Sequence, residues 1–481
     1  MTRHLLFLSA FCLFLISCQD KNENTESTKP NIIYILADDL GYGDLGCYGQ
    51  QIIRTPNIDK LAADGMLFTD HYAGSSVCAP SRATLMLGQH TGHNRVRGNY
   101  ETGPMGFGAC LELRDEDVTI AEVLKQQGYT NGIIGKWGMG MDGTTGEPNK
   151  QGFDYSYGYL NQGHAHNQFP AYLFRNGKRF ELPENQNRAM KSFSNDLFTK
   201  EALTFLEEKK ENPFFLYMAY TTPHAEMHLP SSDIFDSYKG KVDEKAYKNM
   251  SEPDKIDGNK VAYRSQEFPA AAYAAQITHL DSCVGVLVQK LKDLGLEENT
   301  LIMFSSDNGP HSEGGANPRY FQSSGPLRGQ KRDLYEGGVR VPFIAKWPSK
   351  IKPNSVSNHI SAFWDMFPTF SEAAGATFDQ KIDGKSLLPT LTGNTAAQEK
   401  QDYLYWEFHE NRTTNQAVRK GNWKAVRMDP DGEVELYDLT KDIGETKNVA
   451  GNHPEVVMEM TDLLNNTRTE HEIWKMRGSK K

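Results

Sequence analysis

The feature that most constrains the fold is a repeated order of short buried strands and helices. Asn31 to Leu36 is an apolar run rich in β-branched residues, and a helix-like stretch opens at Thr55-Pro56. Helices alternating with buried strands predict an α/β fold, with a mostly parallel central sheet sandwiched by helices. Further helices are expected over 120–127, 196–209 and 273–291, each before an apolar strand, over 129–134, 214–220 and 301–304.

The hydrophobic pattern of the sequence changes after Gly393. Short alternating runs separated by turn residues occupy 403–437, and 454–466 has the pattern of a helix. These runs predict a smaller C-terminal α+β subdomain with a small antiparallel sheet. Because no linker rich in Gly, Ser or Pro precedes it, we expect it to dock rigidly on the α/β domain. The predicted division is 30–395 for the α/β domain and 396–481 for the C-terminal subdomain.

The N-terminus has the pattern of an export signal. Arg3 precedes an apolar run from Leu5 to Ile16, which is short for a membrane span and favours a signal peptide over residues 1–18. Residues 15–18 resemble a bacterial lipobox, which predicts lipidation at Cys18 and a polar tether over 19–29. The expected location is the bacterial cell envelope, lipid-anchored in the periplasm or on the cell surface, with membrane contact only through the anchor. Plain secretion is the alternative.

The charge balance excludes one class of partner. The formal net charge is −10 and the sequence pI is about 5.8. A nucleic-acid-binding protein needs a basic surface to displace counterions, so no nucleic-acid partner is expected. An anionic substrate would need a local basic cluster.

Polar residues follow four of the predicted strands. Taken singly, each is typical of a helix cap or a turn. Together they lie where open α/β sheets bind ligands, because the carboxyl ends of parallel strands meet at one edge. We therefore expect them to converge on one cleft. They are Asp38 and Asp39, Lys136, His224, and Asp307 with Asn308.

These side chains include a set of hard oxygen ligands. Three carboxylates and one amide oxygen, from Asp38, Asp39, Asp307 and Asn308, suit Ca²⁺ and, less readily, Mg²⁺. The sequence contains no Cys and His cluster with zinc spacing beside them. A calcium site is therefore predicted at this edge of the sheet.

The stretch Cys78-Ala79-Pro80-Ser81-Arg82 places a thiol at fixed spacing from Pro, Ser and Arg. Its plain interpretation is a small buried hydrophobe beside a turn-forming proline. If Pro80 opens a helix, Arg82 lies one turn after Cys78 and faces the same way. Lys136 and Lys331 add compact positive charges suited to the oxygens of a bound anion.

These motifs, in this order, resemble a formylglycine-dependent type I sulfatase of the alkaline phosphatase superfamily, and in particular bacterial polysaccharide sulfatases. The resemblance extends over nearly all of the chain from Asn31 onward. The matching segments are 31–41, 78–88, 135–140, 222–224, 305–309 and 325–342.

The resemblance implies that a sulfatase-maturation enzyme oxidises Cys78 to formylglycine. The hydrated aldehyde then attacks sulfur in line, the alcohol leaves, and the second hydroxyl expels sulfate. His224 is implied as the general acid for the leaving oxygen, with a backbone hydrogen bond as its plain alternative. The implied metal ligands are Asp38, Asp39, Asp307, Asn308 and the formylglycine at Cys78, and the residues around the sulfate are Arg82, Lys136, His224 and Lys331.

One position departs from the family pattern. Gly138 stands where many relatives have His after the Lys-Trp pair. A hydrogen bond often made to the formylglycine hydroxyl must then come from elsewhere or be absent. His311 is a candidate substitute.

The substrate is expected to be a sulfated carbohydrate. The segment 161–167, with His164 and His166, resembles segments in bacterial sulfatases that act on galactose-type units, and polar groups beside aromatic rings suit a sugar. A surface loop with satisfied histidines is the alternative. Further sulfates or carboxylates along a polymer could be met by Arg95, Arg97, Arg319 and Arg332, although isolated charges are usually only solvated. The sugar, the hydroxyl position, exo or endo action and the oligomeric state stay open.

Two other functions fit part of this pattern. A phosphate-ester hydrolase of the same superfamily would share the sheet and the metal edge, but usually has a Ser or Thr nucleophile and paired zinc. A non-catalytic glycan-binding lipoprotein would share the export signal and the aromatic residues, and becomes favoured if Cys78 stays a thiol.

Overall fold

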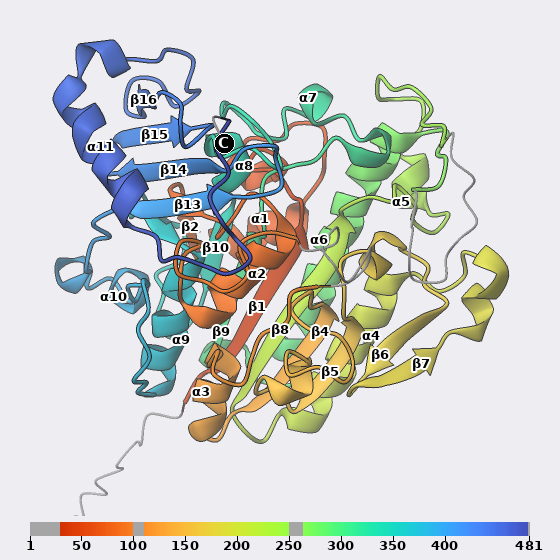
Figure 1. The fold of residues 1–481 in the computed structure, drawn as a ribbon. Coiled ribbons are helices and arrows are strands. Elements are labelled where there is room, and N and C mark those ends of the chain that lie inside the picture. Colours follow the sequence, from red (N-terminus) through yellow and green to blue (C-terminus); the bar gives the residue numbers. More distant parts are fainter. Residues whose placement is uncertain (1–28, 100–109, 250–262, 480–481) are drawn as a thin grey trace, which may run out of the picture.

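The computed structural model describes residues 29–99, 110–249 and 263–479, and a ten-stranded sheet forms its centre (Figure 1). The middle of the sheet is parallel: β1 pairs with β8 and β9, and β4 pairs with β8 and β5. The α/β fold predicted from the strand and helix order is confirmed. From edge to edge the strands are β11 (Ser355–Ser357), β2 (Met66–Phe68), β10 (Phe343–Lys346), β9 (Thr300–Ser306), β1 (Asn31–Asp38), β8 (Phe214–Pro223), β4 (Thr130–Lys136), β5 (Tyr155–Tyr159), β6 (Tyr172–Arg175) and β7 (Lys178–Glu181).

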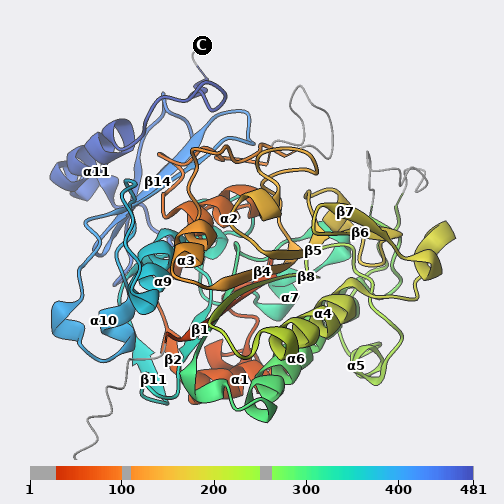
Figure 2. The same ribbon diagram turned by 90° about the horizontal axis from the view of Figure 1, so that it is seen from below.

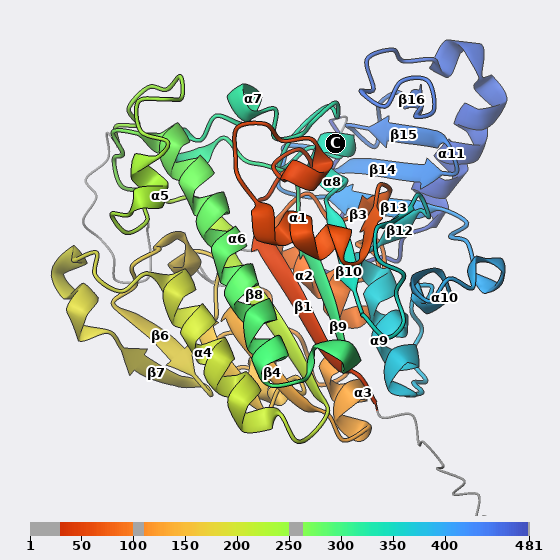
Figure 3. The same ribbon diagram turned by 180° about the vertical axis from the view of Figure 1, so that it is seen from behind.

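Helices cover both faces of the sheet, as Figures 2 and 3 show. Successive side chains of a strand point to opposite faces. In β1, Ile33 and Ile35 therefore join the core on one face, and Ile32, Tyr34 and Leu36 join the core on the other. The first face carries α1 (Pro56–Ala63), α4 (Ser194–Lys209) and α6 (Pro269–Asp293), and the second carries α2 (Cys78–Leu87), α3 (Ile120–Gln126) and α9 (Met366–Ala374).

Local sequence signals explain how two of these helices are bounded. Thr119 and Glu122 form a capping box at the start of α3, which satisfies two otherwise unpaired backbone N–H groups. Gly88 ends α2 in the left-handed region, with φ +67°. The remaining short elements are α5 (Asp233–Asp236), α7 (Pro318–Phe321), α8 (Glu336–Val339), α10 (Leu388–Leu391), and the two-stranded pair β3 (His71–Tyr72) and β12 (Ser361–Ala362).

The C-terminal part is a four-stranded antiparallel sheet with one helix packed on it. Trp406 joins a core with Trp364 of the α/β domain, and Lys424 forms a buried ion pair with Glu336 at 2.8 Å. These contacts explain why the subdomain needs no flexible linker. The division at residue 395 stays a prediction. The elements are β13 (Leu404–Phe408), β14 (Asn415–Lys420), β15 (Trp423–Arg427), β16 (Glu435–Asp438) and α11 (Pro454–Asn466).

The predicted signal peptide, the lipidation site at Cys18 and all but the last residue of the tether lie outside the described residues. Within the described residues, no helix is both long enough and apolar enough to traverse a bilayer. Cys47, Cys78 and Cys283 are free thiols.

Candidate active site

The carboxyl ends of β1, β4, β8 and β9 meet at one edge of the sheet (Figure 1). Asp38 and Lys136 are the last residues of their strands, so the backbone ladder itself positions both side chains. Asp39 then leaves the sheet with φ +66°, a conformation uncommon for residues other than glycine. Nine predicted site residues come together here with little or no exposure: Asp38, Asp39, Cys78, Arg82, Lys136, His224, Asp307, Asn308 and Lys331.

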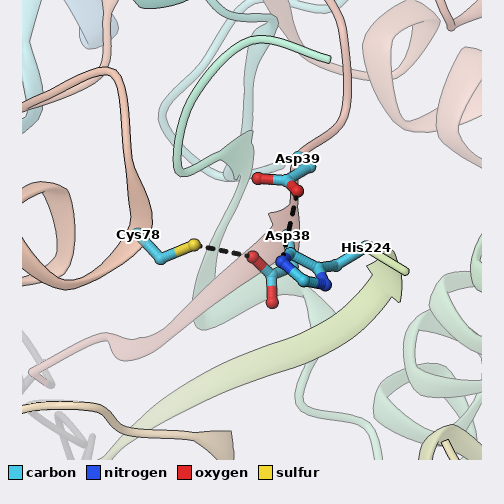
Figure 4. A group of neighbouring side chains, drawn as sticks. All are labelled: Asp38, Asp39, Cys78 and His224. Atoms are coloured by element: carbon cyan, nitrogen blue, oxygen red, sulfur yellow. Dashed lines mark hydrogen bonds and ion pairs between the residues drawn. The ribbon is translucent and has the colours of Figure 1, made fainter. Parts of the chain in front are cut away.

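Potential metal ligands lie close together at this edge. Asp38, Asp39, Cys78 and His224 each offer one ligand atom, and these atoms all lie within 4.8 Å of one another (Figure 4). The figure shows the Cys78 thiol and the His224 ring on either side of the Asp38 carboxylate, with Asp39 above them. Residues from β1, from α2 and from the end of β8 thus surround one small volume.

Asp307 and Asn308 lie beside the same carboxylates. The Asp39 backbone N–H donates to Asp307 Oδ1 at 3.0 Å, and Asn308 Nδ2 donates to Asp39 Oδ1 at 2.7 Å. Asn308 Oδ1 is buried and has no hydrogen-bond partner among the residues that the structure describes. A buried polar atom normally has a partner, so this oxygen is available to a ligand.

The donor set fits a hard divalent cation. Burial and the negative charge of Asp38 raise the pKa of Asp307 to about 7, so the crowded carboxylates repel one another. A cation relieves this repulsion and satisfies the free oxygen of Asn308. Oxygen atoms from carboxylates and an amide are the ligands that Ca²⁺ prefers, and Mg²⁺ accepts them in stricter geometry.

Two lysines pair with the acidic residues of this cluster. Lys136 Nζ lies 2.7 Å from Asp38 Oδ2, and Lys331 Nζ lies 2.8 Å from Asp39 Oδ2. Burial opposes ionisation of Asp38, but the Lys136 ammonium and the other nearby cations hold its pKa well below the usual value. Both lysines therefore stay charged beside the carboxylates, where they can also meet the oxygens of an anion.

Arg82 is fixed by contacts on three sides. Its Nη2 lies 2.7 Å from Asp307 Oδ2 and 3.6 Å from Asp38 Oδ1, and its Nη1 donates to the Lys136 carbonyl at 2.7 Å. As expected from the spacing, it lies one turn after Cys78 on α2. Through these contacts the guanidinium fixes the positions of Asp307 and Asp38 relative to α2, the helix that carries Cys78.

Cys78 is the first residue of α2, where the partial positive charge of the helix end favours negative charge on a nearby group. Its Sγ donates to Asp38 Oδ1 at 3.3 Å. Burial, and then the charge of Asp38, raise the pKa of the Cys78 thiol well above its usual value. Cys78 Sγ occupies the position that the oxygen atoms of an oxidised side chain would take.

His224 faces the acidic cluster with Nε2. Its Nδ1 donates to the Ala225 carbonyl at 2.5 Å, and Nε2 lies 3.5 Å from Asp39 Oδ2. Burial, followed by the charge of Lys331, lowers the pKa of His224 to about 4. The neutral ring therefore has its proton on Nδ1 and its lone pair on Nε2. Protonation of Nε2 then requires a nearby negative charge, such as a bound anion.

The three other histidines singled out from the sequence lie at different places. His166 stacks on His224 with ring centroids 4.8 Å apart, so it borders the site. His311 stacks on the other side of His224 at 5.6 Å, but both of its ring nitrogens are engaged, by the Pro223 carbonyl and the Glu313 N–H. It has no free nitrogen for the side chain at position 78.

His164 lies outside the cluster. Its ring packs against Tyr159 and Tyr172, with centroids 4.9 Å and 4.4 Å away. It shares a single 3₁₀ turn with His166. Residues two apart in such a turn point in directions about 120° apart, so only one of the two can face the site.

Glu313 is a site residue that the sequence did not reveal. Its carboxylate lies 3.8 Å from both Lys331 Nζ and His224 Nε2, and it accepts a hydrogen bond from the Tyr263 hydroxyl at 2.6 Å. Lys331 lowers the pKa of Glu313 despite its burial. Glu313 lies in the loop after β9, where no periodicity or spacing marked it.

Gln162 is another residue that the sequence did not single out, and it lies beside Gly138, two residues after Lys136. A Cβ at Gly138 would lie 1.9 Å from Gln162 Nε2, so the amide fills the space that a side chain at 138 would take. Gln162 is only 2% exposed, and within the described part of the chain neither of its amide atoms has a hydrogen-bond partner. It belongs to the same segment after β5 as His166, which borders the site.

Gly138→Ala is expected to destabilise the protein by more than about 1 kcal/mol, because the new methyl group displaces Gln162 and φ is +83°. Thermal unfolding measures the effect. Gly143→Ala is the matched control, since its φ of +79° imposes similar strain but no atom lies within 4 Å of its Cβ. Equal losses in the two variants would show that Gln162 does not occupy the space beside Gly138.

The comparisons with known proteins agree with this geometry. The Sulfatase family matches residues 30–376, and the family described as N-sulphoglucosamine sulphohydrolase, C-terminal, matches residues 329–470. Arylsulfatase A of Homo sapiens is 33% identical, with 90% of this chain and 87% of the relative covered. An N-acetylgalactosamine-6-O-sulfatase of Bacteroides thetaiotaomicron is 29% identical, with 93% and 95% covered.

Solved structures show the same fold over nearly the whole chain. Ps i-CgsB, in complex with k-i-k-neocarrahexaose, superposes with a TM-score of 0.73 at 29% identity, covering 90% of this chain and 91% of the other. The PsFucS1 sulfatase from Pseudoalteromonas sp. gives a TM-score of 0.70 at 25% identity, covering 91% and 90%. The match over residues 30–376 and the identity to arylsulfatase A establish the family. The chain belongs to the type I sulfatases, which are sulfuric ester hydrolases with the alkaline phosphatase fold.

Proposed function

We propose that this sulfatase removes sulfate from carbohydrates with a formylglycine formed from Cys78 and with Ca²⁺ held at the edge of the sheet. One observation carries the proposal. Cys78 contacts Asp38, and Asp38 in turn contacts Lys136 and Arg82, so the oxidisable side chain, the oxygen ligands and the cations share one buried cluster. Such a cluster suits an anionic ester attacked beside a divalent ion.

The residues of the chain have separate tasks in this reaction. Lys136 and Lys331 bind the sulfate oxygens and stabilise the charge that develops on them. Arg82 keeps Asp307 and Asp38 in position beside the nucleophile. The aldehyde hydrate at position 78 supplies an attacking hydroxyl and a second one that allows sulfate to leave. A bound Ca²⁺, held by Asp38, Asp39, Asp307 and Asn308, supplies Lewis-acid polarisation.

Names of relatives support a carbohydrate substrate. One is named for N-acetylgalactosamine 6-O-sulfate, and one solved relative binds a neocarrahexaose. Beside the site, the His166 ring stacks on His224, and the Tyr263 ring contacts both at an angle. These rings offer flat faces and polar edges, which suits a sugar ring. We assign galactose-type units as the substrate class.

The partner that the proposed reaction requires is a sulfatase-maturation enzyme. Lipidation at Cys18 would anchor the sulfatase itself in the cell envelope.

A comparison of esters tests this function. Protein produced with a sulfatase-maturation enzyme is expected to release sulfate from 4-methylumbelliferyl sulfate and from sulfated galactosides, and to release little phosphate from the matching phosphate ester. Protein made without that enzyme is expected to be inactive on both. Faster phosphate release would support the phosphate-ester hydrolase, and carbohydrate binding without turnover would support a binding protein.

His224→Ala is expected to slow hydrolysis by about 10²- to 10⁴-fold for alkyl and sugar sulfates, because a poor leaving group needs a proton from Nε2. The loss on an activated aryl sulfate is expected to be smaller, since a phenolate leaves without that proton. Steady-state kcat/KM on the two ester types measures the difference. Equal losses would instead make His224 a positioning residue.

A further inference from the structure

A hollow in the protein surface includes a direct chain neighbour of the active-site residue Lys331. Its volume is about 430 Å³, within the range of roughly 300–1,000 Å³ typical of small-molecule sites. Its walls come from α7 and the loop that follows, which lie beyond the carboxyl ends of the parallel strands (Figure 1). The lining is polar for the most part, and its side chains include Arg319, Gln322, Ser324, Gln330 and Asp333.

The hollow is connected to the site through the backbone. Gln330 lines it and directly precedes Lys331, whose Nζ contacts Asp39. The Gln330 side chain also donates to the Ser312 hydroxyl at 3.2 Å, one residue before Glu313. Because Gln330 directly precedes Lys331, the hollow lies near the site, within reach of a substrate longer than one sugar unit.

Arg319 provides the positive charge of this hollow. Its side chain is exposed, and its guanidinium forms no ion pair or hydrogen bond with any of the described residues. Nearby arginines differ: Arg332 pairs with Glu313 at 2.6 Å, and Arg328 lies over the Tyr335 ring at 3.7 Å. An arginine without a partner in the wall of a pocket is suited to bind a sulfate or carboxylate in bidentate geometry.

The rest of the lining suits hydroxyl groups. Gln322 contributes an amide to the lining. The Asp333 carboxylate accepts a hydrogen bond from the Gln330 backbone N–H at 2.9 Å, and no other hydrogen bond from the described residues. A carboxylate on one wall repels a second anion there and accepts hydrogen bonds from hydroxyls. The lining therefore combines one anion-binding group with several hydroxyl-binding groups, as one acidic sugar unit requires.

We propose that this hollow is a subsite for a second sugar unit that carries a sulfate or carboxylate, bound through Arg319. The inference rests on the proposed function, because it requires a carbohydrate sulfate at the catalytic site. It specifies the substrate as an anionic oligosaccharide or polysaccharide that spans at least two units, and it makes Arg319 a determinant of chain-length preference.

The kinetic test compares long and short substrates. Arg319→Ala is expected to lower the ratio of kcat/KM for sulfated hexasaccharides to kcat/KM for 4-methylumbelliferyl sulfate by about tenfold, the cost of one charged hydrogen bond. The hexasaccharides are prepared from carrageenan and from chondroitin sulfate. Lys441→Ala is the matched control, because it removes an 81% exposed positive charge from the C-terminal subdomain. An unchanged ratio for both hexasaccharides overturns the subsite.

A binding measurement separates failure of the subsite from failure of the proposed function. Calorimetry compares Cys78→Ala with Cys78→Ala/Arg319→Ala, using the same hexasaccharides and a monosulfated galactose. The subsite predicts about tenfold weaker hexasaccharide binding in the double variant, with a loss that shrinks as salt is raised. Equal binding overturns it. An enzyme that hydrolyses no sulfate ester, yet shows the Arg319-dependent binding, would refute the proposed reaction and support the anion-binding hollow.

Discussion

Cys78→Ala is expected to abolish sulfate release, lowering kcat/KM by at least about 10⁴-fold, because it removes the nucleophile for which the surrounding charges are arranged. The same change deletes one buried sulfur atom, so unfolding free energy is expected to fall by only about 1 kcal/mol. Sulfate release and thermal unfolding are the two measurements. Together they separate loss of chemistry from loss of fold.

Two other buried cysteines provide the controls for this experiment. Cys110 and Cys283 lie outside the cluster, so replacing either with alanine leaves the nucleophile intact. We expect each control to retain nearly all of its activity on an aryl sulfate. Full activity of Cys78→Ala would refute the assigned nucleophile, whereas loss in all three variants would indicate a general effect on folding.

The second large effect is expected from removal of the cation. Treatment with a chelator should lower activity at least about 100-fold, because four carboxylate and amide ligands are then left facing one another, and Ca²⁺ should restore it. Ca²⁺ at about 100 times its dissociation constant should also stabilise the fold by about 2.7 kcal/mol. Activity assays and thermal unfolding with and without Ca²⁺ measure both effects.

Variants show whether the predicted ligands hold this cation. Asp39→Asn is expected to reduce both the activity and the stabilisation by Ca²⁺. Asp281→Asn is the control, because Asp281 is also buried but accepts hydrogen bonds from Ile58 and Asn57 far from the cluster. If Asp39→Asn kept the full thermal response to Ca²⁺, the ion would have to bind elsewhere.

The sheet and most of the site follow from the order of strands and helices. Parallel strands place their carboxyl ends at one edge, so Asp38, Lys136, His224 and Asp307 had to lie near each other once β1, β4, β8 and β9 were adjacent. The exact strand ends were less certain. The sequence placed Asp38 and Lys136 after their strands, whereas backbone pairing continues through both residues.

Other parts of the site depend on contacts between distant loops. The sequence treated His164 and His166 alike, but the phase of a single short turn directs one to the site and the other toward Tyr172. Gln162 became visible only as the group that fills the space beside Gly138. Glu313 has no sequence signature, because its proximity to Lys331 depends on how two loops fold over the edge of the sheet.

The central claim is that an oxidised side chain at position 78 performs the chemistry beside a cation held by Asp38 and its neighbours. Mass spectrometry of the peptide containing Cys78, taken from catalytically active protein, tests it most directly. We expect the mass of the aldehyde, in a fraction that rises and falls with specific activity across preparations. An active preparation that contains only the unmodified thiol would contradict the account.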